Sequence, residues 1–86
     1  MDKLSIKKDR ITIVTLTYEL EVRLTLLQLI SIYRNFELED IESCIIIVNS
    51  NPSNNIIIID YLKREIKPSV GEVFFEKLKF VTNDEV

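Results

Sequence analysis

The chain has 86 residues with 11 Lys or Arg, 14 Asp or Glu and no histidine, which gives a net charge of −3. The mildly negative charge and the scattered basic residues argue against nucleic-acid binding, and the absence of histidine excludes histidine catalysis and histidine-ligated zinc. Because 47% of the residues are apolar and only one is glycine, the sequence predicts a single folded domain over residues 1–86.

The first segment, Met1 to Arg10, carries four basic residues and shows little apolar periodicity. It is interpreted as a solvated lead-in to the first strand, with steering of a phosphate group as the alternative. Its composition does not fit a signal peptide, and no apolar run approaches the roughly 20 residues of a membrane helix. We therefore expect a cytoplasmic protein with no membrane span.

The segment from Ile11 to Tyr18 predicts a β-strand, because it is rich in β-branched residues and ends in small hydroxyl residues and a tyrosine. The next segment is ambiguous, since apolar and polar residues alternate from Tyr18 to Leu26 as they do in a half-exposed strand. A helix is favoured because the segment is long and leucine-rich and has glutamates at its start. The predicted helical face carries Val22, Leu26, Leu29, Ile30 and Tyr33.

A polar connection with acidic residues, interpreted as solvated, leads to a second strand from Cys44 to Val48. This run is apolar without alternation, which is typical of a central strand in a parallel sheet covered on both faces. Cys44 is interpreted as a small buried hydrophobe, because no basic residue adjoins it in sequence to stabilise a thiolate. A reactive thiol is the alternative.

The strongest turn signal is the segment from Asn49 to Asn55, where residues that cap, turn or break structure follow one another. Ser53 is the expected N-cap of the helix that follows. Four successive isoleucines are poor helix formers, so a strand over 56–62 stays open as the alternative. The buried side of the helix is predicted to carry Ile56, Ile59, Leu62 and Ile66.

Pro68 and Gly71 form the second clear break, because proline ends a helix and glycine is free to turn. A short helix with an aromatic face follows, and the residues from Lys79 to Thr82 predict a third strand. The predicted fold class is α/β, a small three-layer β-α-β-α-β unit with a mainly parallel sheet and helices on its faces. Right-handed crossovers would bring the polar strand ends together along one edge, where ligands bind in open α/β sheets.

The first strand with its Thr-x-Thr-Tyr end, the leucine-rich segment to Tyr33 and the second strand resemble the opening half of a GT-A-type, family-two-like nucleotide-sugar glycosyltransferase. In that family the first strand typically ends in Pro-Thr-Tyr and the second in Val-Asp-Asp-x-Ser, and both turns hold the nucleoside diphosphate. Here Leu16 stands in place of the proline, and the segment from Asn49 to Ser53 stands in place of the acidic pair. The resemblance runs from Arg10 to Thr82 and implies a Rossmann-like half of a GT-A fold.

The resemblance implies a nucleotide-sugar site at Thr15, Thr17, Tyr18, Asn49, Ser50 and Asn51. The threonines offer hydroxyls, the tyrosine can stack on uracil, and the second turn can contact base and ribose. The residues alone leave an alternative open, in which the tyrosine is an amphipathic cap on the core and the second turn is a loop with no ligand. No catalytic residue and no metal ligand is predicted, because the Asp-x-Asp motif of the family is absent from the sequence. A nucleoside diphosphate sugar with Mn or Mg is expected to react only if the rest of the domain is supplied.

Two functional hypotheses remain open. The first is the nucleotide-sugar-binding half of a glycosyltransferase, incomplete alone, whose metal motif lies in a missing C-terminal half. The second is a small α/β protein-interaction or self-associating module with no small-molecule ligand, and it gains support from the small core that a chain of this length can bury. An exposed apolar edge at Phe74, Phe75 and Phe80 would favour the second hypothesis.

Overall fold

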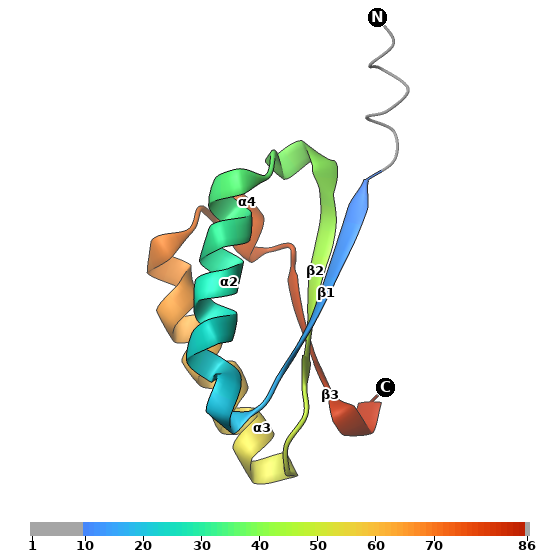
Figure 1. The fold of residues 1–86 in the computed structure, drawn as a ribbon, viewed down its shortest axis with the longest axis vertical. Coiled ribbons are helices and arrows are strands. Elements are labelled where there is room, and N and C mark those ends of the chain that lie inside the picture. The colour runs from blue at the N-terminus through green and yellow to red at the C-terminus, as the bar shows by residue number, and fades with distance from the viewer. Residues whose placement is uncertain (1–9, 86) are drawn as a thin grey trace, which may run out of the picture.

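The computed structural model describes residues 10–85, which form three strands and three α-helices joined by short 3-10 turns (Figure 1). Most of the predicted lead-in, Met1 to Asp9, lies outside the described residues. Within residues 10–85, no helix is long and apolar enough to cross a membrane. The elements in chain order are β1 (Ile11–Thr17), α2 (Val22–Asn35), β2 (Ile41–Val48), α3 (Pro52–Ile66), α4 (Glu72–Phe75) and β3 (Leu78–Thr82).

The sheet has β2 at its centre, with β1 and β3 running parallel to it on either side. Val14 of β1 is level with Ile45, and Val81 of β3 is level with Ile47. The predicted α/β class and the central position of the second strand are confirmed. The sheet is parallel throughout, as expected of strands joined by helical crossovers.

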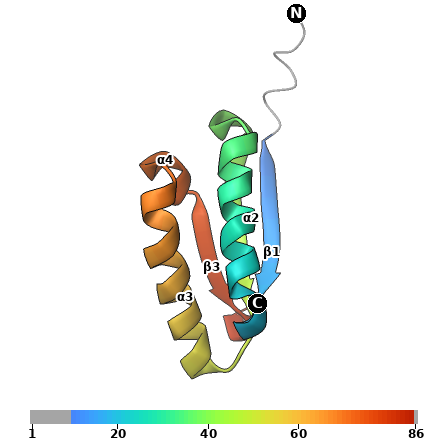
Figure 2. The same cartoon turned by 60° about the vertical axis from the view of Figure 1, so that its left-hand side comes forward.

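Both long helices lie on the same face of the sheet (Figures 1 and 2). The strand order β1-β2-β3 advances in one direction, and successive right-handed crossovers in one direction place their helices on one side. Residues 10–85 therefore form two layers, and the prediction of three layers is wrong. The opposite face of the sheet carries no helix from this part of the chain.

α2 begins at Val22 after a 3-10 turn, η1 (Glu19–Glu21), so the helical interpretation of this segment is confirmed. Its buried residues are Thr25, Leu29 and Ile32. Only one of these belongs to the predicted face. The other residues of that face are partly buried against the core, because the helix is rotated so that the predicted stripe also meets α3.

α3 is a helix throughout, so the alternative strand over 56–62 is wrong. Its N-cap is Asn51, whose side-chain oxygen accepts a hydrogen bond from the Asn54 N–H at 2.8 Å. The prediction of Ser53 as the cap is therefore wrong by two residues. Ile56, which was predicted to be buried, is exposed, and Ile58 is buried. Proline at the first helical position explains the earlier start, because its missing N–H needs no partner there. The buried residues of α3 are Asn55, Ile58, Leu62 and Ile66.

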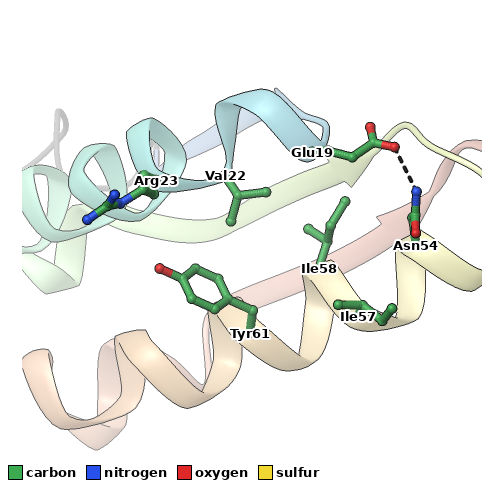
Figure 3. Close-up of a pocket in the computed structure, with 7 residues that line it drawn as sticks. All are labelled: Glu19, Val22, Arg23, Asn54, Ile57, Ile58 and Tyr61. Carbon is green, nitrogen blue, oxygen red and sulfur yellow. Dashed lines mark hydrogen bonds between the residues drawn. The ribbon is translucent and has the colours of Figure 1, made fainter.

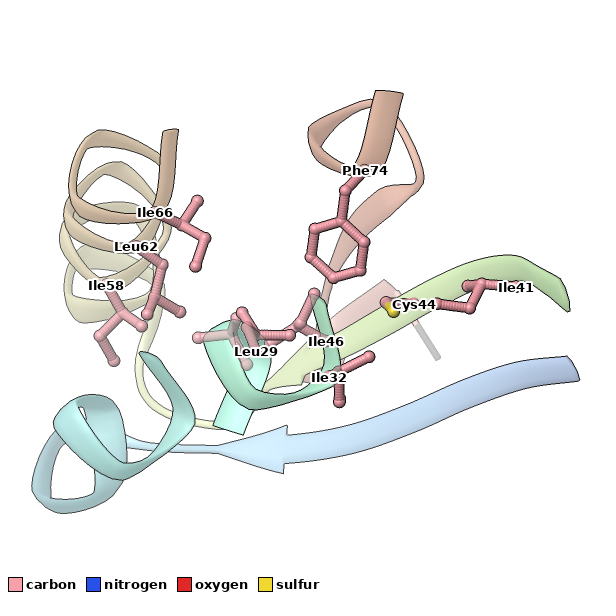
Figure 4. Close-up of a cluster of buried hydrophobic side chains, with 10 residues drawn as sticks. Leu29, Ile32, Ile41, Cys44, Ile46, Ile58, Leu62, Ile66 and Phe74 are labelled. Atoms are coloured by element: carbon pink, nitrogen blue, oxygen red, sulfur yellow. The ribbon is translucent and has the colours of Figure 1, made fainter. Parts of the chain in front are cut away.

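The core lies between the sheet and the two helices, and Phe74 of α4 closes it at one end (Figure 4). β2 contributes more buried side chains than either neighbour, as its continuous apolar sequence predicts. The core consists of Leu29, Ile32, Ile41, Cys44, Ile46, Val48, Ile58, Leu62, Ile66 and Phe74.

Cys44 is 1% exposed, and burial raises the pKa of its thiol despite the opposing charge of Lys77. The interpretation as a buried hydrophobe is confirmed. We expect the thiol to resist an aromatic disulfide reagent in the native protein and to react fully in denaturant. Rapid labelling without denaturant would contradict this packing.

The buried thiol also makes stability depend on pH. Because folding favours the neutral thiol, the free energy of unfolding should decline as the pH rises through the pKa of the unfolded thiol, near 9.

Gly71 precedes α4 with φ −76° and ψ 163°, an extended conformation open to any residue, so its freedom to turn is not used. An added Cβ would lie 3.3 Å from the hydroxyl oxygen of Tyr33. In a Tyr33→Phe background, which removes that oxygen, we expect Gly71→Ala to stabilise the protein by about 0.4–1 kcal/mol. The reason is that alanine lowers the conformational entropy of the unfolded chain. Urea unfolding measures the difference, and a smaller gain is expected with tyrosine present. Destabilisation in the phenylalanine background would contradict the geometry.

Candidate functional site

The carboxyl ends of the three strands lie together at one edge of the sheet. The N–H of Asn49 donates to the carbonyl oxygen of Thr17 at 2.9 Å, which joins the end of β1 to the end of β2. Asn83, after β3, donates through Nδ2 to Oδ1 of Asn49 at 2.9 Å. Asn55 of α3 in turn donates through Nδ2 to Oδ1 of Asn83 at 3.1 Å. Hydrogen bonds between side chains thus tie the loops into one group.

Thr15 and Thr17 point toward α2 from the helix-covered face of the sheet. The Thr15 hydroxyl donates to Oε1 of Gln28 at 2.9 Å. Thr17 is fully buried, and its hydroxyl accepts a hydrogen bond from the hydroxyl of Thr25 at 2.8 Å. Both hydroxyls therefore hold helix to strand, and a ligand would have to displace these contacts to reach them.

The second turn is joined to the first through Glu19. The carboxylate oxygen Oε2 of Glu19 accepts hydrogen bonds from the Ser50 hydroxyl at 2.6 Å and from Nδ2 of Asn54 at 2.8 Å. The bond from Ser50 is the main cause that lowers the pKa of Glu19, followed by a bond within its own backbone and the bond from Asn54. At pH values above the pKa of an unfolded carboxyl, Glu19 is ionised and links the two turns. This link weakens as the pH falls through the lowered pKa of Glu19 in the folded chain.

Sequence reasoning assigned Glu19 only to the start of a helix and did not single out Asn54. The signal was present, since an acidic residue directly follows the Thr-x-Thr-Tyr end of the first strand. Together we call Glu19, Asn49, Ser50, Asn54, Asn55 and Asn83 the strand-end cluster.

One side chain at the strand ends is exposed to a ligand, and one buried acceptor there has no partner. Tyr18 is 40% exposed on an extended backbone, so its ring is accessible at the predicted position. Asn55 is 2% exposed, and its Oδ1 is the one buried side-chain polar atom in residues 10–85 without a hydrogen-bond partner. An acceptor without a partner favours a ligand that donates a hydrogen bond, or a water molecule.

The charge at this edge is negative. Glu19 and Glu21 follow β1, and Asp84 and Glu85 follow β3. Over residues 10–85, no group of three or more His, Cys, Asp or Glu side chains is placed to hold a metal ion. The carboxylates disfavour a phosphate group at this edge. Within the strand-end cluster the Ser50 hydroxyl is paired with the Glu19 carboxylate, but a carboxylate of lowered pKa is a weak base for activating a serine.

A cleft of about 480 Å³ opens beside the strand-end cluster, between α2 and α3 (Figure 3). The Glu19 to Asn54 hydrogen bond lies at one end, and the ring of Tyr61 lies along the cleft with its hydroxyl toward α2 (Figure 3). Most of its lining is apolar, from Val22, Ile57 and Ile58. The cleft is open to solvent and suits an apolar group better than a charged one.

An apolar surface also lies on the sheet face that no helix from residues 10–85 covers. We define this bare face by the outward side chains of the strands, which alternate with the buried ones. Val14 and Leu16 are each 58% exposed there. The bare face consists of Thr12, Val14, Leu16, Ile45, Ile47, Lys79 and Val81.

The exposed aromatic edge that would have favoured an interaction module is not present at Phe74, Phe75 and Phe80. Phe74 is fully buried, and Phe75 and Phe80 are partly buried against the core. The exposed apolar residues come instead from β1, from α2 and from the start of α3. They include Leu20, Leu24, Leu27, Ile56 and Ile57.

Comparison of the chain with models of known protein families, with curated proteins and with solved structures finds no match.

Proposed function

We propose that the chain is a self-associating α/β module whose partner is a second copy of itself. The observation that carries the proposal is the bare face joined to the open edge of β1. Parallel sheets are normally covered on both faces, and here one face keeps an apolar surface in contact with solvent.

Stability supports the same proposal. A domain of this size buries only about 60–65% of the surface of its unfolded chain, so an interface adds a useful share of the total. Each exposed isoleucine, leucine or valine that association covers contributes up to about 1.5–3 kcal/mol. Association would therefore offset part of the cost of leaving these apolar side chains in water.

The test is the mass of the purified chain in solution, measured by light scattering and sedimentation from dilute to concentrated samples. We expect a mass that rises toward twice that of one chain as the concentration increases, because mass action favours the associated state. A single-chain mass at every concentration, in a sample that circular dichroism shows to be folded, would overturn the proposal.

A second candidate function is the nucleotide-sugar-binding half of a glycosyltransferase. It is favoured by the convergence of the three strand ends and by the free acceptor atom of Asn55, which a base N–H or a ribose hydroxyl could meet. The carboxylate of Glu19 disfavours the diphosphate, so the expected affinity is weak. A metal ion would have to come with the remainder of such a domain.

Titration of the labelled chain with uridine diphosphate, with and without manganese, tests the second function by two-dimensional NMR. Binding predicts shifts at Thr15, Thr17, Tyr18 and Asn49 to Asn51 that do not depend on the metal. An Asn55→Leu variant, similar in shape but with no acceptor, should lose those shifts. Unchanged spectra at millimolar ligand would remove this function and leave self-association as the account of the chain.

A further inference from the structure

The backbone of β1 presents a row of unused hydrogen-bonding groups at the open edge of the sheet. The carbonyl of Thr17 accepts from Asn49 and therefore points toward β2. Since backbone groups alternate along a strand, those of Ile13 and Thr15 also point toward β2. The N–H and C=O groups of Thr12, Val14 and Leu16 point the other way, where residues 10–85 provide no further strand.

β1 has few of the features that keep an edge strand from pairing, and its ladder with β2 shifts register only between Ile11 and Thr12. Its seven residues, Ile-Thr-Ile-Val-Thr-Leu-Thr, include no charge, no proline and no glycine. The opposite edge is protected, because β3 has only five residues and carries Lys79, and Lys63 lies over the ring of Phe80. In addition, the Thr82 N–H is already bonded to Oε1 of Glu85 at 2.8 Å. Pairing is therefore expected at β1.

We propose that two copies associate through antiparallel pairing of their β1 strands, with the two-fold axis at Val14. This inference rests on the proposed function and specifies its geometry. In this register Val14 faces Val14 of the second copy, and Thr12 faces Leu16 in both directions. Each facing pair exchanges two backbone hydrogen bonds, so the three pairs make about six. The result is a continuous six-stranded sheet with all four long helices on one face.

The ends of β1 are complementary in charge in this register. In its own chain, Nη1 of Arg10 lies 3.5 Å from Oε1 of Glu42. In the pair, Arg10 would lie opposite Tyr18 of the second copy and next to Glu19 of that copy. The basic beginning of one strand thus meets the acidic end of the other. The opposite-charge contact and the aromatic ring each favour the antiparallel arrangement.

The two α2 helices beside the paired β1 strands are also compatible with pairing. Gln28 bonds to Thr15, so its side of α2 lies over β1, and Leu24 and Ser31 lie on that side at helical spacing. With strands about 4.8 Å apart, the two α2 helices would lie about 10 Å apart, which is a normal packing distance. This side of α2 carries no charge to oppose contact, and Leu24, which is 60% exposed, would be covered.

A proline substitution separates edge pairing from packing on the bare face. Val14→Pro removes an N–H that points away from β2 and has no strand to pair with in residues 10–85, whereas Val14→Ala shortens the side chain and keeps the N–H. We expect Val14→Pro to be monomeric at concentrations where the natural chain and Val14→Ala are dimeric. A dimer of Val14→Pro with unchanged affinity would overturn the pairing.

Single cysteines test the register, since Cys44 is buried and does not compete. Facing residues lie about 5.5 Å apart between Cα atoms, within the range of a disulfide, so Val14→Cys should cross-link in mild oxidant. Two Thr12 residues would lie about 13 Å apart, so Thr12→Cys should not cross-link, and adding Leu16→Cys should restore the bond.

The outcomes distinguish the two proposals. A monomeric natural chain overturns self-association and the pairing together. A dimer in which Thr12→Cys cross-links as readily as Val14→Cys keeps self-association and overturns this register. The same holds if Val14→Cys does not cross-link at all. If Val14→Pro fails to fold by circular dichroism, the cysteine variants alone decide the result.

Discussion

Replacing Phe74 by alanine is expected to lower the free energy of unfolding by about 3–5 kcal/mol. The ring is fully buried and its centroid lies 5.3 Å from that of Tyr33, with the two planes inclined at 56°. Removing it leaves a cavity at the closed end of the core and loses this aromatic contact. A domain of 86 residues has a total stability of about 4–13 kcal/mol, so the variant should be close to unfolding.

Phe75→Ala is the matched control for that experiment. Its ring is only partly buried and lies 5.6 Å from the Lys67 ammonium, an exposed contact of small value. We expect a loss of about 1–2 kcal/mol, clearly less than for the neighbouring residue. Urea unfolding of both variants gives the comparison. Equal losses, or a larger loss at position 75, would show that α4 is rotated from the arrangement described.

The buried hydroxyl pair of Thr17 and Thr25 gives the second large expected effect. Thr17→Val removes the acceptor and leaves a buried hydroxyl donor without its partner, which should cost about 1–3 kcal/mol. Replacing both threonines by valine removes the unsatisfied group, so the double variant should be more stable than Thr17→Val alone. Chemical denaturation of the single and double variants provides the interaction free energy.

Thr15→Val provides the control, because the hydroxyl of Thr15 is bonded to Gln28 at an exposed position. We expect a change within about 0.5 kcal/mol. Losses at positions 17 and 25 that simply add would contradict the hydroxyl pair. Additive losses would also mean that the Thr17 hydroxyl is not engaged by Thr25 and is available for the ligand role that the resemblance implies.

The strands could be predicted because their signals are local. β1 and β2 are β-branched runs bounded by polar residues, and the apolar continuity of β2 indicated its central position. α2 was predicted correctly despite alternating residues at its start, because leucine-rich length outweighed the short alternation. Local composition therefore gave the identity and order of the elements.

The helix faces and the number of layers could not be predicted in the same way. Asn51 and Ser53 are both good N-caps, so the sequence does not decide between them. Leu62 and Ile66 are buried as predicted, but four successive isoleucines offer neighbouring stripes of the helix, and the core takes Ile58 where Ile56 and Ile59 were predicted. The single covered face depends on strand order, which is a property of the folded chain and not of any segment. The strand-end cluster is likewise tertiary, because Glu19 meets Ser50 and Asn54 only after the crossover from β1 to β2 forms.

The position of the exposed apolar surface could not be predicted. An exposed edge at the phenylalanines would have favoured the interaction module, but Phe74 completes the core, and Phe75 and Phe80 pack against it. The valine and leucine of β1 remain outside, because their face of the sheet has no helix above it. Alternation along a strand identifies two faces, and it does not say which face a helix will cover.

Amide hydrogen exchange along β1, measured by NMR at low and high protein concentration, shows directly whether the β1 strands pair. We expect Ile13, Thr15 and Thr17 to be protected at both concentrations, because their N–H groups point toward β2. We expect Thr12, Val14 and Leu16 to exchange rapidly in dilute solution and to become protected as the chain associates. Association with no gain of protection at these three amides would contradict the proposed pairing of the β1 strands.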